Sequence, residues 1–149
     1  MPAKRRVRKA PPRFALVATA GAIDDFKDVP AGARSLVKTR LRRLAMEGCR
    51  VAGYSLSGDT PWPKLCSKHI GEDWRVVVAF QADDSIVIIK IALHDDKRDP
   101  YAEIAVELNV PISTAERTKP PCCEDGVPPM LDQEVLETLS QAFRNLRGI

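Results

Sequence analysis

Acid–base and cationic side chains gather in one short segment of the chain, His94–Tyr101, whose sequence is His-Asp-Asp-Lys-Arg-Asp-Pro-Tyr. The segment directly follows an apolar run, which places it at the rim of a sheet, where sites tend to lie. His94 is the member of this group whose unperturbed pKa suits a proton donor or acceptor near pH 7. With neighbouring cations, such a residue can support cleavage of RNA by its own 2′-hydroxyl. An ordinary charged loop at the end of a strand has the same composition, so this alternative stays open.

Two strongly apolar runs, Trp74–Gln81 and Ser85–Leu93, predict a β-hairpin with its turn at residues 82–84. In a hairpin, the start of one strand lies beside the end of the next. Arg75 is therefore expected next to the His94–Tyr101 segment. Because both runs are continuous, we expect central strands that are covered on at least one face.

Further cations are expected near the same end of the sheet. Lys64 and Lys68 lie on a predicted strand, Lys64–His69, that precedes the hairpin.

Apolar residues recur at three- and four-residue intervals over Ala31–Glu47, which predicts an amphipathic helix closed by Gly48. The remaining positions of this helix are rich in basic residues, among them Arg34, Lys38, Arg42 and Arg43.

The chain is expected to form one domain with two tails. Residues 1–13 are rich in Lys, Arg and Pro, which predicts a disordered basic tail. Residues 14–109 are the predicted domain, beginning with a strand at Phe14–Ala20. Residues 110–149 are a predicted linker and amphipathic helix, Leu131–Leu146. The apolar stripe of that helix must pack on the domain, on a second copy or on a partner.

The net charge of +3 hides an uneven distribution. Residues 1–50 carry 13 Lys and Arg against 4 Asp and Glu, whereas residues 51–149 carry 10 against 16. A polyanion such as RNA is therefore expected to prefer the first third of the chain. The apolar runs are shorter than the ~20 residues of a membrane helix, so we expect no membrane contact and a cytoplasmic location.

Four cysteines are present, and their spacing suggests no metal site. Cys49, Cys66, Cys122 and Cys123 include no C-x-x-C pair, and neither histidine lies at zinc-ligand spacing from them. We expect reduced thiols, no disulfide framework, no structural metal and no cofactor. The adjacent pair Cys122-Cys123 is either a reactive loop or an unremarkable one.

The order and spacing of these elements resemble the RelE/ParE toxin superfamily. The matching residues are Asp73-Trp74-Arg75-Val76-Val77-Val78 and Lys97-Arg98-Asp99-Pro100-Tyr101, with His94 near the place where many members carry a histidine. The resemblance covers roughly residues 14–108. It implies an α+β fold: a small twisted, mainly antiparallel sheet with helices packed on one side, here followed by the C-terminal helix.

Many members of that superfamily cleave messenger RNA on the ribosome without a metal. The resemblance therefore implies RNA and a cognate antitoxin protein as partners. It also implies that Arg75 binds the scissile phosphate, that Lys97 or Arg98 holds its developing charge, and that Tyr101 stacks on a base or assists proton transfer. His94 is the candidate acid or base. The residues expected to contact the RNA backbone are Lys64, Lys68, Arg42 and Arg43.

Two departures from the family pattern leave other functions open. The family has a helical hairpin between its first two strands, whereas this sequence predicts one clear helix preceded by a turn-rich link at Asp24–Pro30. Asp95 and Asp96 also add negative charge at the expected site. Because one fold can serve several functions, the alternatives are a ParE-like inhibitor of DNA gyrase and a noncatalytic module that binds RNA or an antitoxin.

Overall fold

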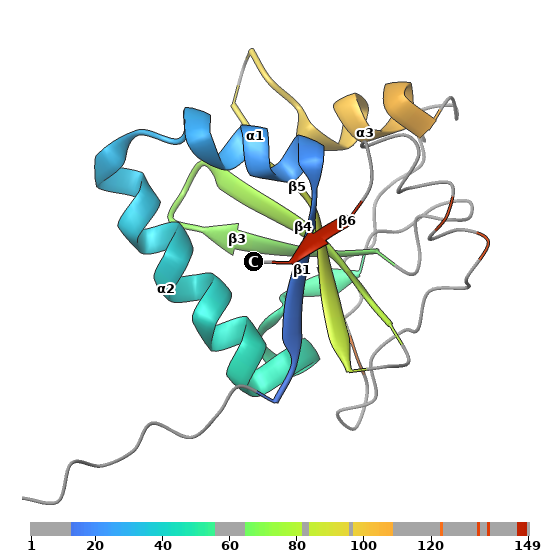
Figure 1. The fold of residues 1–149 in the computed structure, drawn as a ribbon. Coiled ribbons are helices and arrows are strands. Elements are labelled where there is room, and N and C mark those ends of the chain that lie inside the picture. Colours follow the sequence, from blue (N-terminus) through green and yellow to red (C-terminus); the bar gives the residue numbers. More distant parts are fainter. Residues whose placement is uncertain are drawn as a thin grey trace, which may run out of the picture.

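The computed structural model describes residues 13–55, 65–81, 84–95 and 97–108, together with Cys123, Glu134, Glu137 and residues 146–148. These residues form one six-stranded sheet with three α-helices (Figure 1). The elements are β1 (Ala15–Thr19), α1 (Ala20–Asp28), α2 (Ala31–Glu47), the short 3-10 helix η1 (Gly48–Val51), β2 (Tyr54–Ser55), β3 (Leu65–Ile70), β4 (Trp74–Phe80), β5 (Ser85–Leu93), α3 (Pro100–Leu108) and β6 (Leu146–Gly148).

The sheet is mixed but mainly antiparallel, with the strand order β2-β3-β4-β5-β1-β6. Within the described strands, β1 runs parallel to β5, and every other neighbouring pair is antiparallel. The predicted β4–β5 hairpin and the strand before it are confirmed, with a register shift between Val77 and Val78. The α+β class expected from the resemblance is likewise confirmed.

Helices cover both faces of the sheet. Side chains alternate between the faces of a strand, and Val76 and Val78 of β4 pack in one core with residues of α1 and α2. Val77 points to the other face, where it is fully buried, and Ser67 of β3 contacts Tyr101 of α3 there. In addition to the helices expected on one side, α3 therefore lies on the second face (Figure 1).

The region expected as a turn-rich link is mostly helical, which corrects the prediction for residues 24–30. α1 begins at Ala20 because the Thr19 hydroxyl caps it, accepting a hydrogen bond from the Ala22 N–H at 3.0 Å and donating to the Ile89 carbonyl at 3.2 Å. Ile23 and Phe26 then pack on the core. With α2, whose predicted bounds are confirmed, α1 supplies the pair of helices that the resemblance implies after the first strand.

Two elements near the C-terminal end differ from the predictions. α3 was not predicted, although Pro100 stands at its first position and the Asp99 carboxylate accepts hydrogen bonds from the backbone of Tyr101 and Ala102. Leu146 lies in β6 rather than in the predicted helix, because residues 146–148 pair with the free edge of β1. Glu134 and Glu137 are helical. The rest of the predicted C-terminal helix and the tail at residues 1–12 lie outside the described residues.

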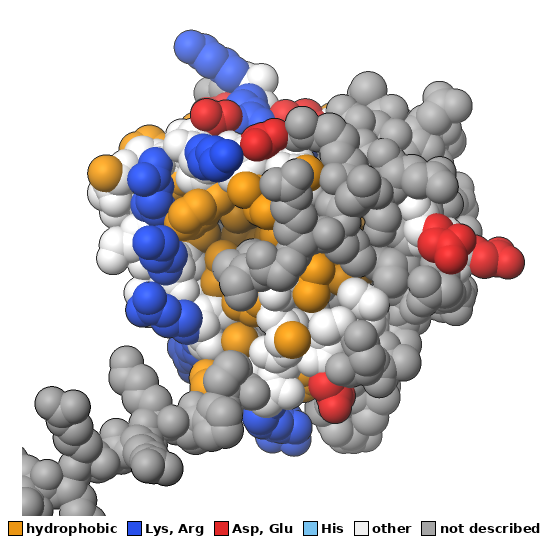
Figure 2. Space-filling model, viewed as in Figure 1, with side chains coloured by type: hydrophobic (Ala, Val, Ile, Leu, Met, Phe, Trp, Pro, Cys, Tyr) orange, Lys and Arg blue, Asp and Glu red, His pale blue; other side chains and the backbone are white. Residues whose placement is uncertain are grey.

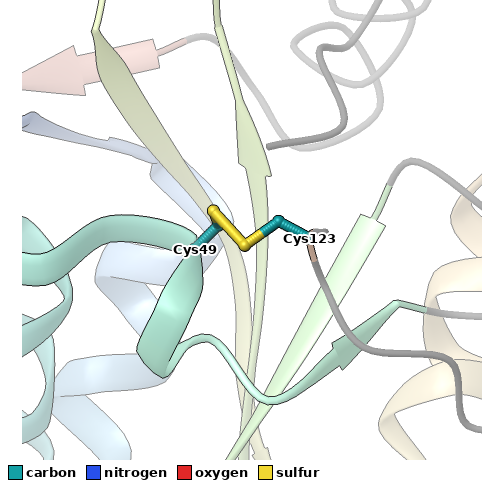
Figure 3. Close-up of a disulfide and its surroundings, with 2 residues drawn as sticks. All are labelled: Cys49 and Cys123. Atoms are coloured by element: carbon teal, nitrogen blue, oxygen red, sulfur yellow. A yellow bond between two sulfur atoms is a disulfide. The ribbon is translucent and has the colours of Figure 1, made fainter. Parts of the chain in front are cut away.

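Cysteine chemistry also differs from the prediction. Cys49 of η1 forms a disulfide with Cys123 (Figure 3), and Cys66 is disulfide-bonded as well. The expectation of reduced thiols is wrong for these residues. The pair lies 74 residues apart, so local spacing gave no sign of it. Cys122 lies outside the described residues. No helix in the described part of the chain is long and apolar enough to cross a membrane.

Candidate functional site

The start of β4 and the end of β5 meet at one end of the sheet. Trp74 pairs with Leu93, Arg75 pairs with Ala92, and the His94 N–H donates to the Asp73 carbonyl at 2.6 Å. The predicted proximity of Arg75 to the segment beginning at His94 is therefore confirmed. This end of the sheet is called the rim below. Its candidate residues are Arg75, His94, Lys97 and Arg98.

The loop after His94 is shaped by one carboxylate. One oxygen of Asp95 accepts hydrogen bonds from the backbone N–H groups of Lys97 and Arg98, both at 2.8 Å. These two bonds hold the pKa of Asp95 below its usual range. The negative charge at Asp95 therefore folds the loop, and the loop presents Lys97 and Arg98 at the exposed surface. Asp96 lies outside the described residues.

Glu103 of α3 connects the rim to the sheet. Its Oε1 atom lies 2.7 Å from a guanidinium nitrogen of Arg98 and 3.7 Å from the buried Lys90 ammonium of β5. The hydrogen bond to Glu103 raises the pKa of Arg98. The Oε2 atom of Glu103 is buried without a hydrogen-bond partner among the described residues. Arg98 is thus fixed in position while its side chain stays 43% exposed.

Arg75 turns its guanidinium back onto the turn between β3 and β4. Its Nη1 atom donates to the carbonyls of Glu72 and Trp74, each at 2.9 Å. Its Nε atom is buried and has no hydrogen-bond partner within the part of the chain that is described. The side chain therefore stabilises the turn, and a phosphate at this position would have to use the remaining N–H groups.

Tyr101 is buried, with 5% of its surface exposed. Its hydroxyl lies 2.6 Å from the Ser67 hydroxyl, and its ring meets the His94 ring edge-to-face at a centroid distance of 5.4 Å. These contacts fasten α3 to β3 and orient His94. In this conformation the Tyr101 ring has no open face for a base, so base stacking would need a movement of α3.

The remaining predicted cations that the structure describes lie on another face than Arg75. Lys68 shares a face of the sheet with Val76 and lies near Arg43 of α2, whereas Arg75 is on the opposite face. Burial and the neighbouring arginines lower the pKa of Lys68. Arg43 pairs with Glu47 at 2.6 Å, and Arg42 is exposed on the same helix. Lys68 therefore lies at the predicted end of the sheet, but it shares the face near α2 and is separated from Arg75 by the sheet. Lys64 lies outside the described residues.

Next to the basic residues of α2 is an apolar cleft that was not predicted from the sequence. Its volume is about 430 Å³, and β1, β5, α1 and α2 line it with mostly apolar side chains, such as Leu16 and Leu41. Lys38 and Arg42 lie on its α2 side, with the Lys38 ammonium 5.8 Å from the centre of the Phe26 ring. Figure 2 shows this apolar surface beside a row of Lys and Arg side chains. Because four separate elements form the cleft, no single sequence motif could predict it.

A smaller, polar pocket of about 200 Å³ borders the rim. The carboxyl of Asp25, half-buried on α1, accepts a hydrogen bond from the Ile91 N–H at 3.1 Å. Burial raises the pKa of Asp25, against the opposing effects of that hydrogen bond, Lys90 and Arg98. The residues lining the pocket are Asp25, Asp28, Pro30, Trp74, Ile91, Leu93 and Arg98. The sequence signal for this pocket is the three-residue spacing of Asp25 and Asp28, which places both on one side of a helix. That signal was not recognised, because the sequence predicted a turn-rich link here instead of a helix.

Among the described residues, no group of three or more His, Cys, Asp and Glu side chains is arranged to hold a metal ion. The rim instead offers the His94 imidazole and several cations, and His69 of β3 pairs with Arg75 in the sheet. Such a set can bind a polyanion and exchange a proton with it.

Comparison with known proteins yields structural similarity only. No protein-family model and no curated protein matches the chain. Among solved structures, the chain is similar to one from the RelBE2 toxin–antitoxin complex of Mycobacterium tuberculosis, with 21% sequence identity and a TM-score of 0.49. The match covers 59% of this chain and 98% of the other chain.

Proposed function

We propose that this chain is a toxin-like protein of the RelE/ParE type that binds RNA at the rim and cleaves it without a metal ion. The rim itself carries the proposal. His94, exposed Lys97 and fixed Arg98 follow one another on the loop that leaves β5, beside the start of β4. The motifs that resemble the superfamily occupy these same positions.

The proposed chemistry assigns roles to three of the rim residues, His94, Lys97 and Arg98, and to Tyr101 behind them. The 2′-oxygen attacks the phosphorus as the bond to the 5′-oxygen breaks. His94 transfers one of the two protons involved, taking it from the 2′-hydroxyl or giving it to the leaving 5′-oxygen, and water exchanges the other. Lys97 and Arg98 stabilise the charge that develops on the phosphate, and the Glu103 contact keeps Arg98 in place for that role. Tyr101 acts by orienting the His94 ring rather than by touching the RNA.

The proposed protein partner is an antitoxin that docks in the apolar cleft. The cleft has an apolar floor and two cations, Lys38 and Arg42, along one side. An amphipathic helix with acidic residues beside its apolar stripe matches both features. Action on messenger RNA implies a cytoplasmic location, where thiols are kept reduced. The Cys49–Cys123 disulfide of the structure is not expected to persist in that compartment, so the redox state of Cys49 in cells distinguishes a cytoplasmic location from an oxidising one.

The decisive experiment is a cleavage assay on labelled single-stranded RNA in the presence of EDTA. We expect products with 2′,3′-cyclic or 3′-phosphate ends, and a 10²- to 10⁴-fold slower reaction for His94→Gln (an order-of-magnitude range). Lys97→Ala should weaken binding and lower the salt dependence by about one counterion. Arg50→Ala is the matched control, because Arg50 is exposed on η1, beyond the far end of α2 from the rim. Its activity should equal that of the unmodified protein.

One structural feature favours a noncatalytic alternative. Tyr101 is buried and Arg75 is engaged with turn carbonyls, so two of the residues expected to contact RNA are used for folding. RNA binding with intact RNA, unchanged by His94→Gln, would establish that alternative. Absence of both binding and cleavage would refute the RNA proposal. Gyrase–DNA cleavage complexes in bacteria that express the chain would indicate the ParE-like function.

A further inference from the structure

The polar pocket beside the rim combines features that point to a specific ligand. Trp74 and Arg75 are consecutive on β4 and so point to opposite faces of the sheet. Arg75 lies on the α3 side, whereas Trp74 lines the pocket together with Leu93 and Arg98. An RNA strand that crosses the rim would therefore pass the mouth of this pocket.

The Asp25 carboxyl favours a ligand that donates hydrogen bonds into the pocket. One of its oxygens accepts from the Ile91 N–H, and burial has removed part of its water. A desolvated carboxylate gains most from a ligand that donates hydrogen bonds to it. Asp28, three residues later on α1, lines the same pocket and adds a second acceptor.

The pocket is lined by both acidic and basic residues, and this limits the class of ligand that can bind there. A lysine or arginine side chain would be repelled by Arg98, and a simple anion would be repelled by Asp25 and Asp28. A nucleotide is compatible with the two aspartates and with Arg98, because its base presents hydrogen-bond donors on one edge while its phosphate is anionic. Among the four RNA bases, guanine alone carries two adjacent donors, N1–H and the 2-amino group, on its Watson–Crick edge. Trp74, which is half-buried, offers a surface on which a base can stack.

We propose that this pocket binds the guanine base of an RNA nucleotide. The base donates to Asp25 and lies against Trp74, and the attached phosphate contacts Arg98. This inference rests on the proposed function in one respect, namely that the guanine belongs to RNA held at the rim. The volume of about 200 Å³ lies below the roughly 300–1,000 Å³ typical of sites for drug-sized ligands, which suits a single base.

The test is a calorimetric titration of the full chain with four nucleoside monophosphates and inosine monophosphate. We expect GMP to bind at least about tenfold more tightly than AMP, CMP or UMP, because a lost pair of hydrogen bonds to a charged group costs this much or more. Inosine monophosphate lacks the 2-amino group and should bind with intermediate affinity. Asp25→Asn should abolish the preference for GMP, since an amide replaces one acceptor by a donor.

The matched control is Asp84→Asn. Asp84 lies at the opposite end of the hairpin with a φ of 58°, a conformation that asparagine tolerates. This variant should bind GMP like the unmodified protein, and the melting temperature of each variant verifies that it is folded. Equal affinity for all nucleotides, no measurable GMP binding, or a GMP preference that survives in Asp25→Asn would each overturn the inference.

The two proposals fail in different ways. Cleavage of RNA with no excess of sites at guanine, together with no GMP binding, would refute the pocket assignment and leave the ribonuclease proposal standing. Selective binding of GMP by a protein that neither binds nor cleaves RNA would refute the proposed function and support a guanine-nucleotide pocket.

Discussion

Removal of the Cys49–Cys123 disulfide is expected to lower the free energy of unfolding by up to about 4.5 kcal/mol. The bond joins residues 74 apart in sequence. For a loop of this length, the chain-entropy relation gives about 15 cal/mol/K, which is about 4.5 kcal/mol at about 25 °C. This value is an upper bound, because Cys66 also takes part in a disulfide and the unfolded chain is already constrained.

The assay compares the unmodified protein with Cys49→Ala/Cys123→Ala by urea unfolding, both without reductant. Cys49 is 5% exposed. Alanine is used instead of serine, because serine would place an unpaired hydroxyl in the core. The variant should have the lower midpoint. Repeating both measurements with reductant supplies the control, because the difference should then shrink to the packing loss of the two substitutions, about 1–3 kcal/mol.

Two results would refute this reasoning. The first is an equal midpoint for both proteins in the absence of reductant. The second is the detection of Cys49 and Cys123 as free thiols in protein prepared without reductant. Either result would show that the C-terminal part of the chain is not covalently tied to η1 in solution, and would restore the expectation of reduced cysteines.

Three further predictions concern single residues. Tyr101→Phe removes the partner of a buried Ser67 hydroxyl and should cost about 1–3 kcal/mol in chemical unfolding, with Tyr101→Leu as a harsher reference. Gly53→Ala should cost at least about 2 kcal/mol, because φ is +87° and a Cβ would lie 2.5 Å from the Ser67 carbonyl oxygen; equal stability would contradict this. The folded-state pKa of Asp25 is raised above 3.8, so the folded state binds the extra proton and stability should fall as pH rises from 3.8 through that folded pKa. Melting temperatures measured against pH should show this fall weakened in Asp25→Asn, and identical profiles would contradict the assignment.

The strongest local patterns predicted the central part of the fold. Two runs of β-branched residues on either side of a turn specify the β4–β5 hairpin without help from distant residues. The regular apolar spacing of Ala31–Glu47 and the positive φ of Gly48 likewise define α2 and its end. Because register follows from the hairpin, the neighbourhood of Arg75 and His94 was also predictable.

The missed features depend on partners that are distant in sequence. Thr19 caps α1 only because β1 ends there beside Ile89 of β5, 70 residues later in the chain. Tyr101 was assigned a contact with RNA from its motif, whereas its contact with Ser67 arises from the packing of α3 on β3. The cleft and the polar pocket each combine side chains from several elements. No local pattern could have predicted these contacts, since tertiary packing creates them.

α1 links the two proposed recognition surfaces, because it lines both of them. Ile23 and Phe26 face the apolar cleft, while Asp25 and Asp28 line the polar pocket. A helix of this length behaves as one packed element, so an occupant that displaces α1 on the cleft side also changes the position of the Asp25 carboxyl. Thermodynamic linkage then requires that a partner in the cleft and a base in the pocket alter each other's affinity by the same factor. In the proposed toxin-like function, a partner protein could thereby control RNA recognition without covering the rim.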